Sequence, residues 1–167
     1  MMFREMRRSK QLLTREETIA IFERGTNGVL AVSGDEGYPY AVPVSYVYGD
    51  GKIFFHCAKT GHKMDAICRC DKVSFCVVDQ DEVIQESYTT HYRSAIAFGR
   101  AKVLTNDEEK RSALLKLAEK YSPDMGRIRH EQEMEKSWAA VTLVEIAVEH
   151  MTGKECIELV RQKEKKC

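Results

Sequence analysis

The stretch from residue 43 to residue 63 reads PVSYVYGDGKIFFHCAKTGHK, and it predicts a β-hairpin that leads into a basic loop. Residues 38–48 are rich in Val and Tyr and residues 53–57 are apolar, so both segments are predicted strands. An Asp-Gly pair between them is typical of a tight turn joining antiparallel strands. Pro39 and Pro43 lack the N–H that a sheet ladder needs, which predicts an edge or a bulge in the first strand.

The loop at the end of this stretch is basic and precedes a short predicted helix. It carries Lys59, His62 and Lys63, and the helix is predicted over residues 64–68. Free N–H groups at a helix start attract anions, and nearby cations strengthen this attraction. Gly61 would allow a ligand to approach the backbone closely. The loop is thus a candidate phosphate site, and a solvated basic turn is the commoner alternative.

The rest of the chain extends the β pattern around this hairpin. Four further strands are predicted, over residues 29–33, 72–79, 94–104 and 139–149. Gly99 predicts a bulge within one of them. Capping-box sequences that begin at Thr14 and Thr105 predict one helix before the first strand and another before the last. Residues 80–86 are polar and are expected to leave the sheet.

These elements predict a single, mainly β domain over residues 1–167. Short antiparallel strands with glycine turns are typical of a closed or nearly closed β-barrel. The expected fold is therefore a six-stranded β-barrel with helical additions. Residues 1–11 are expected to form a mobile arm, and residues 154–167 a charged tail.

The charge of the chain is balanced. Its 167 residues include 26 Lys and Arg and 26 Asp and Glu, so the formal net charge is zero. Proteins that grip nucleic acid or anionic membranes need an excess of positive charge, so we expect neither as a partner. No stretch approaches the roughly 18 apolar residues of a membrane-spanning helix. No secretory signal is recognised, which leads us to expect a cytoplasmic protein with reduced cysteines.

Motifs for metal binding and for nucleophilic catalysis are missing from the sequence. Cys68 and Cys70 form a C-x-C pair, whereas structural zinc sites use wider C-x-x-C knuckles. The five histidines form no H-x-x-x-H or H-E-x-x-H pattern. P-loop, dinucleotide and serine-nucleophile motifs are not found either. We therefore expect no metal site and no hydrolytic or nucleoside-triphosphate chemistry.

Three further segments are candidates for a binding site. Residues 42–46 form a strand whose prolines leave backbone groups free for a flat heterocycle, although ordinary strand irregularity is the simpler explanation. Residues 88–94 are polar and aromatic, and either line a cleft or begin a strand. Trp138 is either a core anchor or a residue that stacks on a cofactor, the former being commoner.

Residues 43–63, together with the strand SAIAFGRA at 94–101, carry a family resemblance. The chain resembles the pyridoxamine 5′-phosphate oxidase-like FMN-binding split barrels, and within them the branch of the 5-nitroimidazole-resistance (Nim) proteins. The resemblance extends over residues 12–153. It implies a six-stranded split barrel of Greek-key topology, and a homodimer with FMN at the subunit interface.

The resemblance also implies roles for individual residues. The isoalloxazine ring would lie along Val42, Pro43, Val44 and Ser45. The ribityl chain would lie along His56, Cys57 and Ala58. The phosphate would be held by Gly61, His62 and Lys63. Ser94 and Tyr92 would approach from a neighbouring strand, and Trp138 from the partner side of the pocket.

The activity implied by the resemblance is that of an FMN-dependent oxidoreductase. It would reduce a small electron acceptor, such as a nitroaromatic compound, with NAD(P)H as a candidate donor, and the flavin would carry the chemistry. His56 and Tyr92 are candidate proton donors near the ring. The chain lacks the basic and aromatic C-terminal segment with which pyridoxamine phosphate oxidases grip their substrate, so vitamin B6 oxidation is not expected. Two alternatives stay open: a non-catalytic FMN store or electron carrier, and a haem-handling split-barrel relative.

Overall fold

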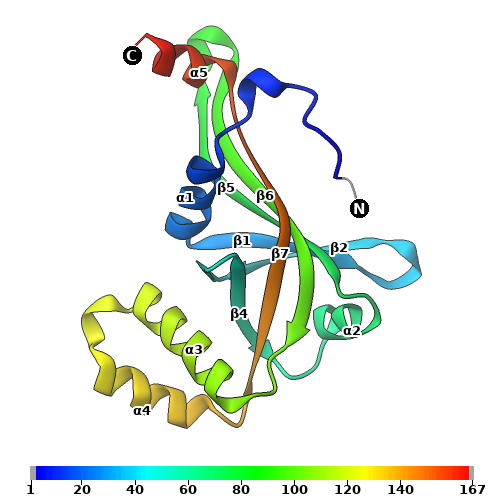
Figure 1. The fold of residues 1–167 in the computed structure, drawn as a ribbon, viewed down its shortest axis with the longest axis vertical. Coiled ribbons are helices and arrows are strands. Elements are labelled where there is room, and N and C mark those ends of the chain that lie inside the picture. Colours follow the sequence, from blue (N-terminus) through cyan, green and yellow to red (C-terminus); the bar gives the residue numbers. More distant parts are fainter. Residues whose placement is uncertain (1–2, 166–167) are drawn as a thin grey trace.

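The computed structural model describes residues 3–165, which form one sheet surrounded by helices (Figure 1). The strands are β1 (Asn27–Ser33), β2 (Pro39–Ser45), β3 (Val47–Gly49), β4 (Lys52–Ala58), β5 (Lys72–Ile84), β6 (Thr89–Val103) and β7 (Val141–Glu155). The helices are α1 (Arg15–Arg24), α2 (His62–Arg69), α3 (Asp107–Tyr121), α4 (Arg127–Ser137) and α5 (Ile157–Glu164).

The order of strands across the sheet shows that it is a split barrel. The order is β2-β1-β5-β6-β7-β4-β3, and every paired neighbour is antiparallel. Strands β2 and β3 stand at opposite ends of this order, yet only Tyr46 separates them along the chain. Because neighbouring strands lie about 4.8 Å apart, a sheet of this width can bring its two ends together only by curling round. No ladder joins the two end strands, so the barrel stays open there.

The predicted mainly β barrel is confirmed, with seven strands in place of six. The additional strand arises because the segment predicted as one strand over residues 38–48 is divided at Tyr46. The chain crosses from one edge of the sheet to the other at this residue, so its two halves belong to different edges.

Strands β5 and β6 are longer than the sequence predicts. Residues 80–84, which the polar composition places outside the sheet, pair with residues 89–93. The two strands continue as a ribbon beyond the barrel (Figure 1). The side chains of this ribbon are exposed or half-buried, so it lacks the apolar alternation by which strands are recognised.

Local signals for caps and bulges are partly confirmed. Thr14 caps α1 as predicted, with its hydroxyl accepting from Glu17 N–H and the Glu17 carboxylate accepting from Thr14 N–H. The capping box predicted at Thr105 is wrong, because Asn106 occupies the cap and its side chain accepts from two N–H groups of α3. The predicted bulge at Gly99 is confirmed, and a Cβ there would lie 2.2 Å from a carbonyl oxygen of β7.

Two apolar cores lie on opposite sides of β4. Ile53 and Phe55 are fully buried inside the barrel, together with Phe75. Phe54 points the other way and packs with Leu117 under the hairpin of α3 and α4. The hairpin therefore covers the outside of the barrel beside β4, as Figure 1 shows.

Tyr46 is the buried link between the two edges of the sheet. Its side chain is 0% exposed, and its hydroxyl donates to the carbonyl of Phe22 in α1 at 2.8 Å. Its N–H donates to the hydroxyl of Tyr121 in α3 at 2.8 Å, and the same hydroxyl contacts the carbonyls of Tyr46 and Thr26. Burial raises the pKa of Tyr46 well above its ordinary value, so the hydroxyl remains a donor. Gly25 makes room for it, since a Cβ there would lie 2.6 Å from this hydroxyl.

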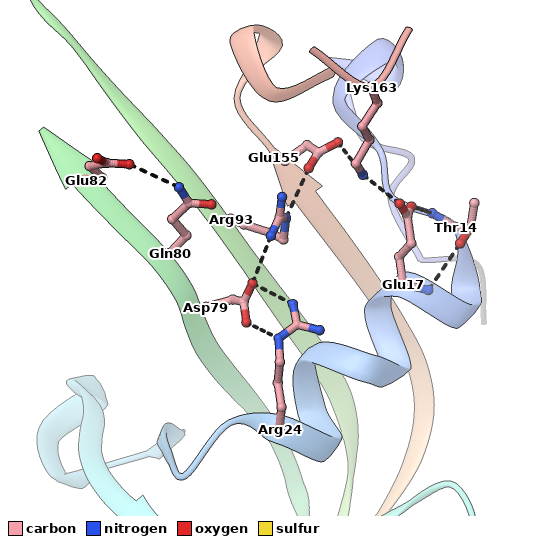
Figure 2. A network of polar contacts seen from close by, with 9 residues as sticks. All are labelled: Thr14, Glu17, Arg24, Asp79, Gln80, Glu82, Arg93, Glu155 and Lys163. Atoms are coloured by element: carbon pink, nitrogen blue, oxygen red, sulfur yellow. Dashed lines mark hydrogen bonds and ion pairs between the residues drawn. The ribbon is translucent and has the colours of Figure 1, made fainter. Parts of the chain in front are cut away.

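A network of charges joins segments near the two ends of the chain (Figure 2). Glu155, at the end of β7, is 2% exposed and accepts from Arg93 Nε at 3.0 Å. Lys163 of α5 lies 2.7 Å from the same carboxylate and 2.6 Å from Glu17 of α1. A carboxylate this deeply buried needs such partners, because an unpaired buried charge is strongly destabilising.

The network continues through Asp79 to α1. Arg24 donates two hydrogen bonds to Asp79, at 2.5 and 2.6 Å, and Arg93 donates a third at 3.3 Å. Burial alone would raise the pKa of Asp79, but the two guanidinium groups outweigh it and hold that pKa below its ordinary value. The carboxylate is therefore ionised at neutral pH, and it holds α1 against the base of the ribbon.

The segments expected to be an arm and a tail contain ordered elements. Gln11 is buried, and the Phe3 ring stacks on His150 at 4.6 Å. The expected tail includes the end of β7 and helix α5. Residues 1–2 and 166–167 of the arm and tail lie outside the described residues. None of the helices within residues 3–165 has the length and apolar character required to cross a membrane.

Replacing Tyr46 with Phe should destabilise the fold by about 1–3 kcal/mol, because the substitution leaves the buried Phe22 carbonyl without its donor. Urea denaturation followed by circular dichroism would measure the free energy of unfolding. Tyr38→Phe is the matched control, since Tyr38 is 76% exposed, and it should leave that energy unchanged. Equal stability of the two variants would contradict the role assigned to the Tyr46 hydroxyl.

Candidate functional site

A cavity of about 550 Å³ opens where the edges of β2 and β4 separate. Residues from five elements and the α4–β7 connection line it: Pro43, Val44, Ser45, His56, Cys57, Ala58, Lys63, Ser137, Ala140 and Val141. Seven of these are sequence-predicted site residues, from β2, β4 and the start of α2. The split in the barrel therefore gathers most of the predicted residues into one place.

The strand edges facing this cavity have backbone groups available for a ligand. Strand β2 pairs only with β1, so its other edge is unpaired within the described sheet. Strand β3 pairs with β4 only as far as Phe54, which leaves the stretch from His56 to Ala58 paired on one side, with β7. Unpaired N–H and C=O groups on a strand edge can bind a partner with complementary donors and acceptors.

The start of α2, from which Lys63 contributes to the cavity lining, has the features of an anion site. Gly61 precedes α2 with φ of 128°, a conformation that favours glycine, and its Cβ position is open. Within residues 3–165, the N–H groups of His62 and Lys63 have no hydrogen-bond acceptor, whereas those of the next two residues bond to the Gly61 carbonyl. The structure thus places a helix start beside the Lys63 ammonium group.

The pKa of the Cys57 thiol is influenced both by burial and by the charge of Lys63. Burial raises the pKa of its thiol, and the positive charge of Lys63 acts in the opposite direction. The net pKa is raised, so the thiol is neutral at physiological pH. Its sulfur lies 3.4 Å from that of Met64, and the thiol thus serves as apolar lining.

Two predicted residues near the cavity direct their side chains elsewhere. Val42 packs against the barrel core. The His62 ring stacks on Tyr40 at 4.1 Å and lies 3.5 Å from the Asp35 carboxylate. The His62 ring thus faces Tyr40 and Asp35, while its backbone N–H at the start of α2 is left without an acceptor within residues 3–165.

Three predicted residues lie away from the cavity in the single chain. Tyr92 and Ser94 belong to β6, which pairs with β5 and β7 and is not a neighbour of β2 or β4. The ammonium group of Lys154 lies over the Tyr92 ring. Trp138 packs on the outer core, and the ammonium group of Lys110 lies 4.2 Å from its ring centroid. None of the three is among the residues that line this cavity in the single chain.

Three lining residues are not anticipated by the sequence. Ser137, Ala140 and Val141 arrive at the cavity because α4 ends where β7 begins beside β4. They are small or apolar and belong to no motif, so only the tertiary arrangement identifies them. Within the described residues no group of three or more His, Cys, Asp or Glu side chains is arranged to hold a metal ion.

Solved structures with the same fold come from several bacteria. A candidate 5-nitroimidazole antibiotic resistance protein from Bacteroides thetaiotaomicron is 21% identical, with a TM-score of 0.74 and 86% of each chain covered. A conserved hypothetical protein from Mycobacterium tuberculosis is 20% identical, with a TM-score of 0.74 and coverage of 93% of this chain and 92% of that one. An FAD- and haem-binding protein from Mycobacterium smegmatis is 21% identical, with a TM-score of 0.72 and coverage of 89% and 74%.

The family of the chain is shown by comparing its sequence with known protein families. No curated protein matches it significantly. The family profile described as pyridoxamine 5′-phosphate oxidase matches residues 14–155, which include every strand of the barrel. The chain therefore belongs to the pyridoxamine 5′-phosphate oxidase family.

Proposed function

We propose that the protein binds FMN in the cavity between β2 and β4 and acts as an oxidoreductase for a small electron acceptor, such as a nitroaromatic compound. One observation carries the proposal: a single cavity is lined both by Lys63, from the start of α2, and by the free edges of β2 and β4. These two features suit the phosphate and the heterocyclic ring of a flavin mononucleotide. The M. smegmatis protein of the same fold, described as binding FAD and haem, supports a flavin as the ligand class.

The residues of the cavity would bind and orient the cofactor. Lys63 and the N–H groups at the start of α2 would hold the phosphate. The edges of β2 and β4 would receive the polar atoms of the ring, and Cys57 and Val44 would exclude water beside it. His56 is exposed within the cavity and could hold a proton near the ring. The flavin, when bound, supplies the transfer of one or two electrons.

We also propose that two copies of the chain form a dimer across the outer face of the barrel. The outward side chains in the central part of β1, β2, β5 and β6 are apolar or small. They form two rows across the sheet: Pro43, Val29, Cys76 and Ile96 in one, and Ala41, Ala31, Ser74 and Phe98 in the other. Val29, Ile96 and Phe98 are each more than a third exposed in the single chain. A contiguous apolar patch of this kind is characteristic of a protein interface.

The position of Pro43 connects the dimer with the cofactor. Pro43 ends one of the two apolar rows and also lines the cavity. A second copy packed on this face would therefore reach the mouth of the cavity. Because both copies would use the same face, the dimer would have twofold symmetry. The same residues of the partner copy would then lie at the mouth of each of the two cavities.

The purified protein should be yellow, and denaturation should release FMN rather than FAD, as chromatography of the supernatant would show. Under anaerobic conditions NADH or NADPH should bleach the bound flavin, and a nitroaromatic acceptor should restore its colour. Colourless protein that binds no added FMN would overturn the proposal. Bound flavin that neither nicotinamide reduces would instead indicate an FMN store or carrier.

Replacing Lys63 with Ala should weaken FMN binding about tenfold or more, because it removes a charge-assisted contact with the phosphate. Flavin fluorescence titration measures the affinity. Lys59→Ala is the matched control, since Lys59 lies in the loop just before α2 but does not line the cavity. Riboflavin, which has no phosphate, should bind both variants and the parent equally. A Lys63→Ala variant with unchanged FMN affinity would remove this residue from the phosphate site.

Replacing Ile96 with Glu should convert the dimer to monomers and lower FMN affinity, because the substitution places a charge within one of the two apolar rows. Light scattering after size-exclusion chromatography measures the mass. Val83→Glu makes the same kind of change on the ribbon, where Val83 is 69% exposed, and should leave the dimer intact. A monomeric parent protein, or a dimer unaffected by Ile96→Glu, would contradict this interface.

A further inference from the structure

A second cavity, of about 530 Å³, lies under the hairpin of α3 and α4 and adjoins the first. The two cavities share Ser45, His56, Ser137 and Val141 in their linings. The volume is within the range of roughly 300–1,000 Å³ that is usual for small-molecule sites. A molecule held in the second cavity would therefore lie next to whatever occupies the first.

The walls of the second cavity are mainly apolar. Leu114 and Leu117 of α3 and Met134 of α4 contribute buried side chains, each less than 9% exposed. Tyr121 also lines the cavity. Its hydroxyl is already hydrogen-bonded to the N–H and the carbonyl of Tyr46. The polar groups that remain for a ligand come chiefly from α4.

His130 is the buried polar group of this cavity. It is 5% exposed, and its ring has no hydrogen-bond or ion-pair partner within residues 3–165. Gln11 Oε1 is the one fully buried side-chain nitrogen or oxygen atom described there without a partner, so the ring nitrogens of His130 are accessible from the cavity that it lines. The great majority of buried polar side chains in proteins have such a partner. An imidazole that lines a cavity without one is suited to donate a hydrogen bond to a ligand.

Arg129 supplies an uncompensated positive charge beside His130. Its neighbour Arg127 pairs with Glu131 at 2.9 Å, whereas Arg129 has no ion pair among the residues that the structure describes. Glu133 also lines the cavity, but its carboxylate lies 3.2 Å from the Lys136 ammonium group. The charge left unbalanced at this cavity is therefore positive.

We propose that this second cavity is the substrate site, and that it selects a small carboxylic acid with an apolar body. The inference rests on the proposed function, because it requires a flavin in the adjoining cavity. Arg129 and His130 would bind the carboxylate, since a guanidinium group pairs well with two carboxylate oxygens. The leucine and methionine side chains would hold the apolar body. The shared residues would then direct the opposite end of the molecule toward the flavin.

Binding of benzoate and of its neutral counterpart benzamide tests this selection. Calorimetric titration of the FMN-loaded protein should show benzoate binding at least about tenfold more tightly than benzamide, with a shift of the flavin absorption band. Arg129→Ala should remove most of this preference and leave benzamide binding unchanged. His130→Gln should weaken benzoate binding as well, and thermal unfolding of each variant would establish that it is folded.

Arg127→Ala is the matched control, because Arg127 is two residues before Arg129 on the same helix but does not line the cavity. It should retain the preference for benzoate. Equal binding of benzoate and benzamide by FMN-loaded protein, or equal losses in Arg127→Ala and Arg129→Ala, would overturn the inference while the proposed function stands. Arg129-dependent benzoate binding by a protein that takes up no FMN would overturn both the proposed function and the assignment of this cavity as a substrate site.

Discussion

The fold depends on one connection: a single residue, Tyr46, joins the two edges of the sheet. Five other strands lie between β2 and β3 in the sheet order, so this connection is possible only if the sheet has curled completely round. The residue that makes it must also be held in place. The hydroxyl of Tyr46 is fixed by α1 and its N–H by Tyr121 of α3. Helices α1 and α3 are thus attached at the point where the chain passes from one edge of the sheet to the other.

The same connection creates the candidate site. Since β2 and β3, on either side of Tyr46, belong to opposite edges of the sheet, no ladder joins β2 to β4, and backbone groups remain free in the opening between them. Helix α2 contributes Lys63 to the lining of that opening, next to the free N–H groups at its start. The hairpin of α3 and α4, attached through Tyr121, closes a second cavity beside it. Two adjoining cavities therefore follow from one irregularity in an otherwise continuous sheet.

Most of the fold can be predicted from local sequence, because hairpins, caps and bulges are determined by residues close together in the chain. The Asp-Gly hairpin turn, the Thr14 cap and the Gly99 bulge are examples. The polar ribbon of β5 and β6 is missed because it has no buried face to mark it. The Thr105 cap is wrong because Asn106, one residue later, offers an equally good acceptor.

The residues of the candidate site likewise fall into those that local sequence predicts and those that only the tertiary structure reveals. The contributions of β2, β4 and α2 lie within one short stretch of sequence and can be predicted together. Ser137, Val141, Arg129 and His130 come from distant segments without a motif, and only the packing of α4 against the barrel brings them in. Conversely, Tyr92 and Ser94 are placed elsewhere by the strand order, which the sequence does not reveal.

The pairing of β4 with β7 has a consequence for synthesis on the ribosome. Lys52 and Glu145, which bond across these strands at 3.0 Å, are 93 residues apart. Strand β4 therefore emerges long before its partner, and its apolar residues cannot be covered until nearly the whole barrel has been translated. Such distant pairings slow folding and leave strand edges exposed to other chains. The nascent protein is thus most vulnerable to aggregation, and most in need of a chaperone, during the interval between the synthesis of Ala58 and that of Val141.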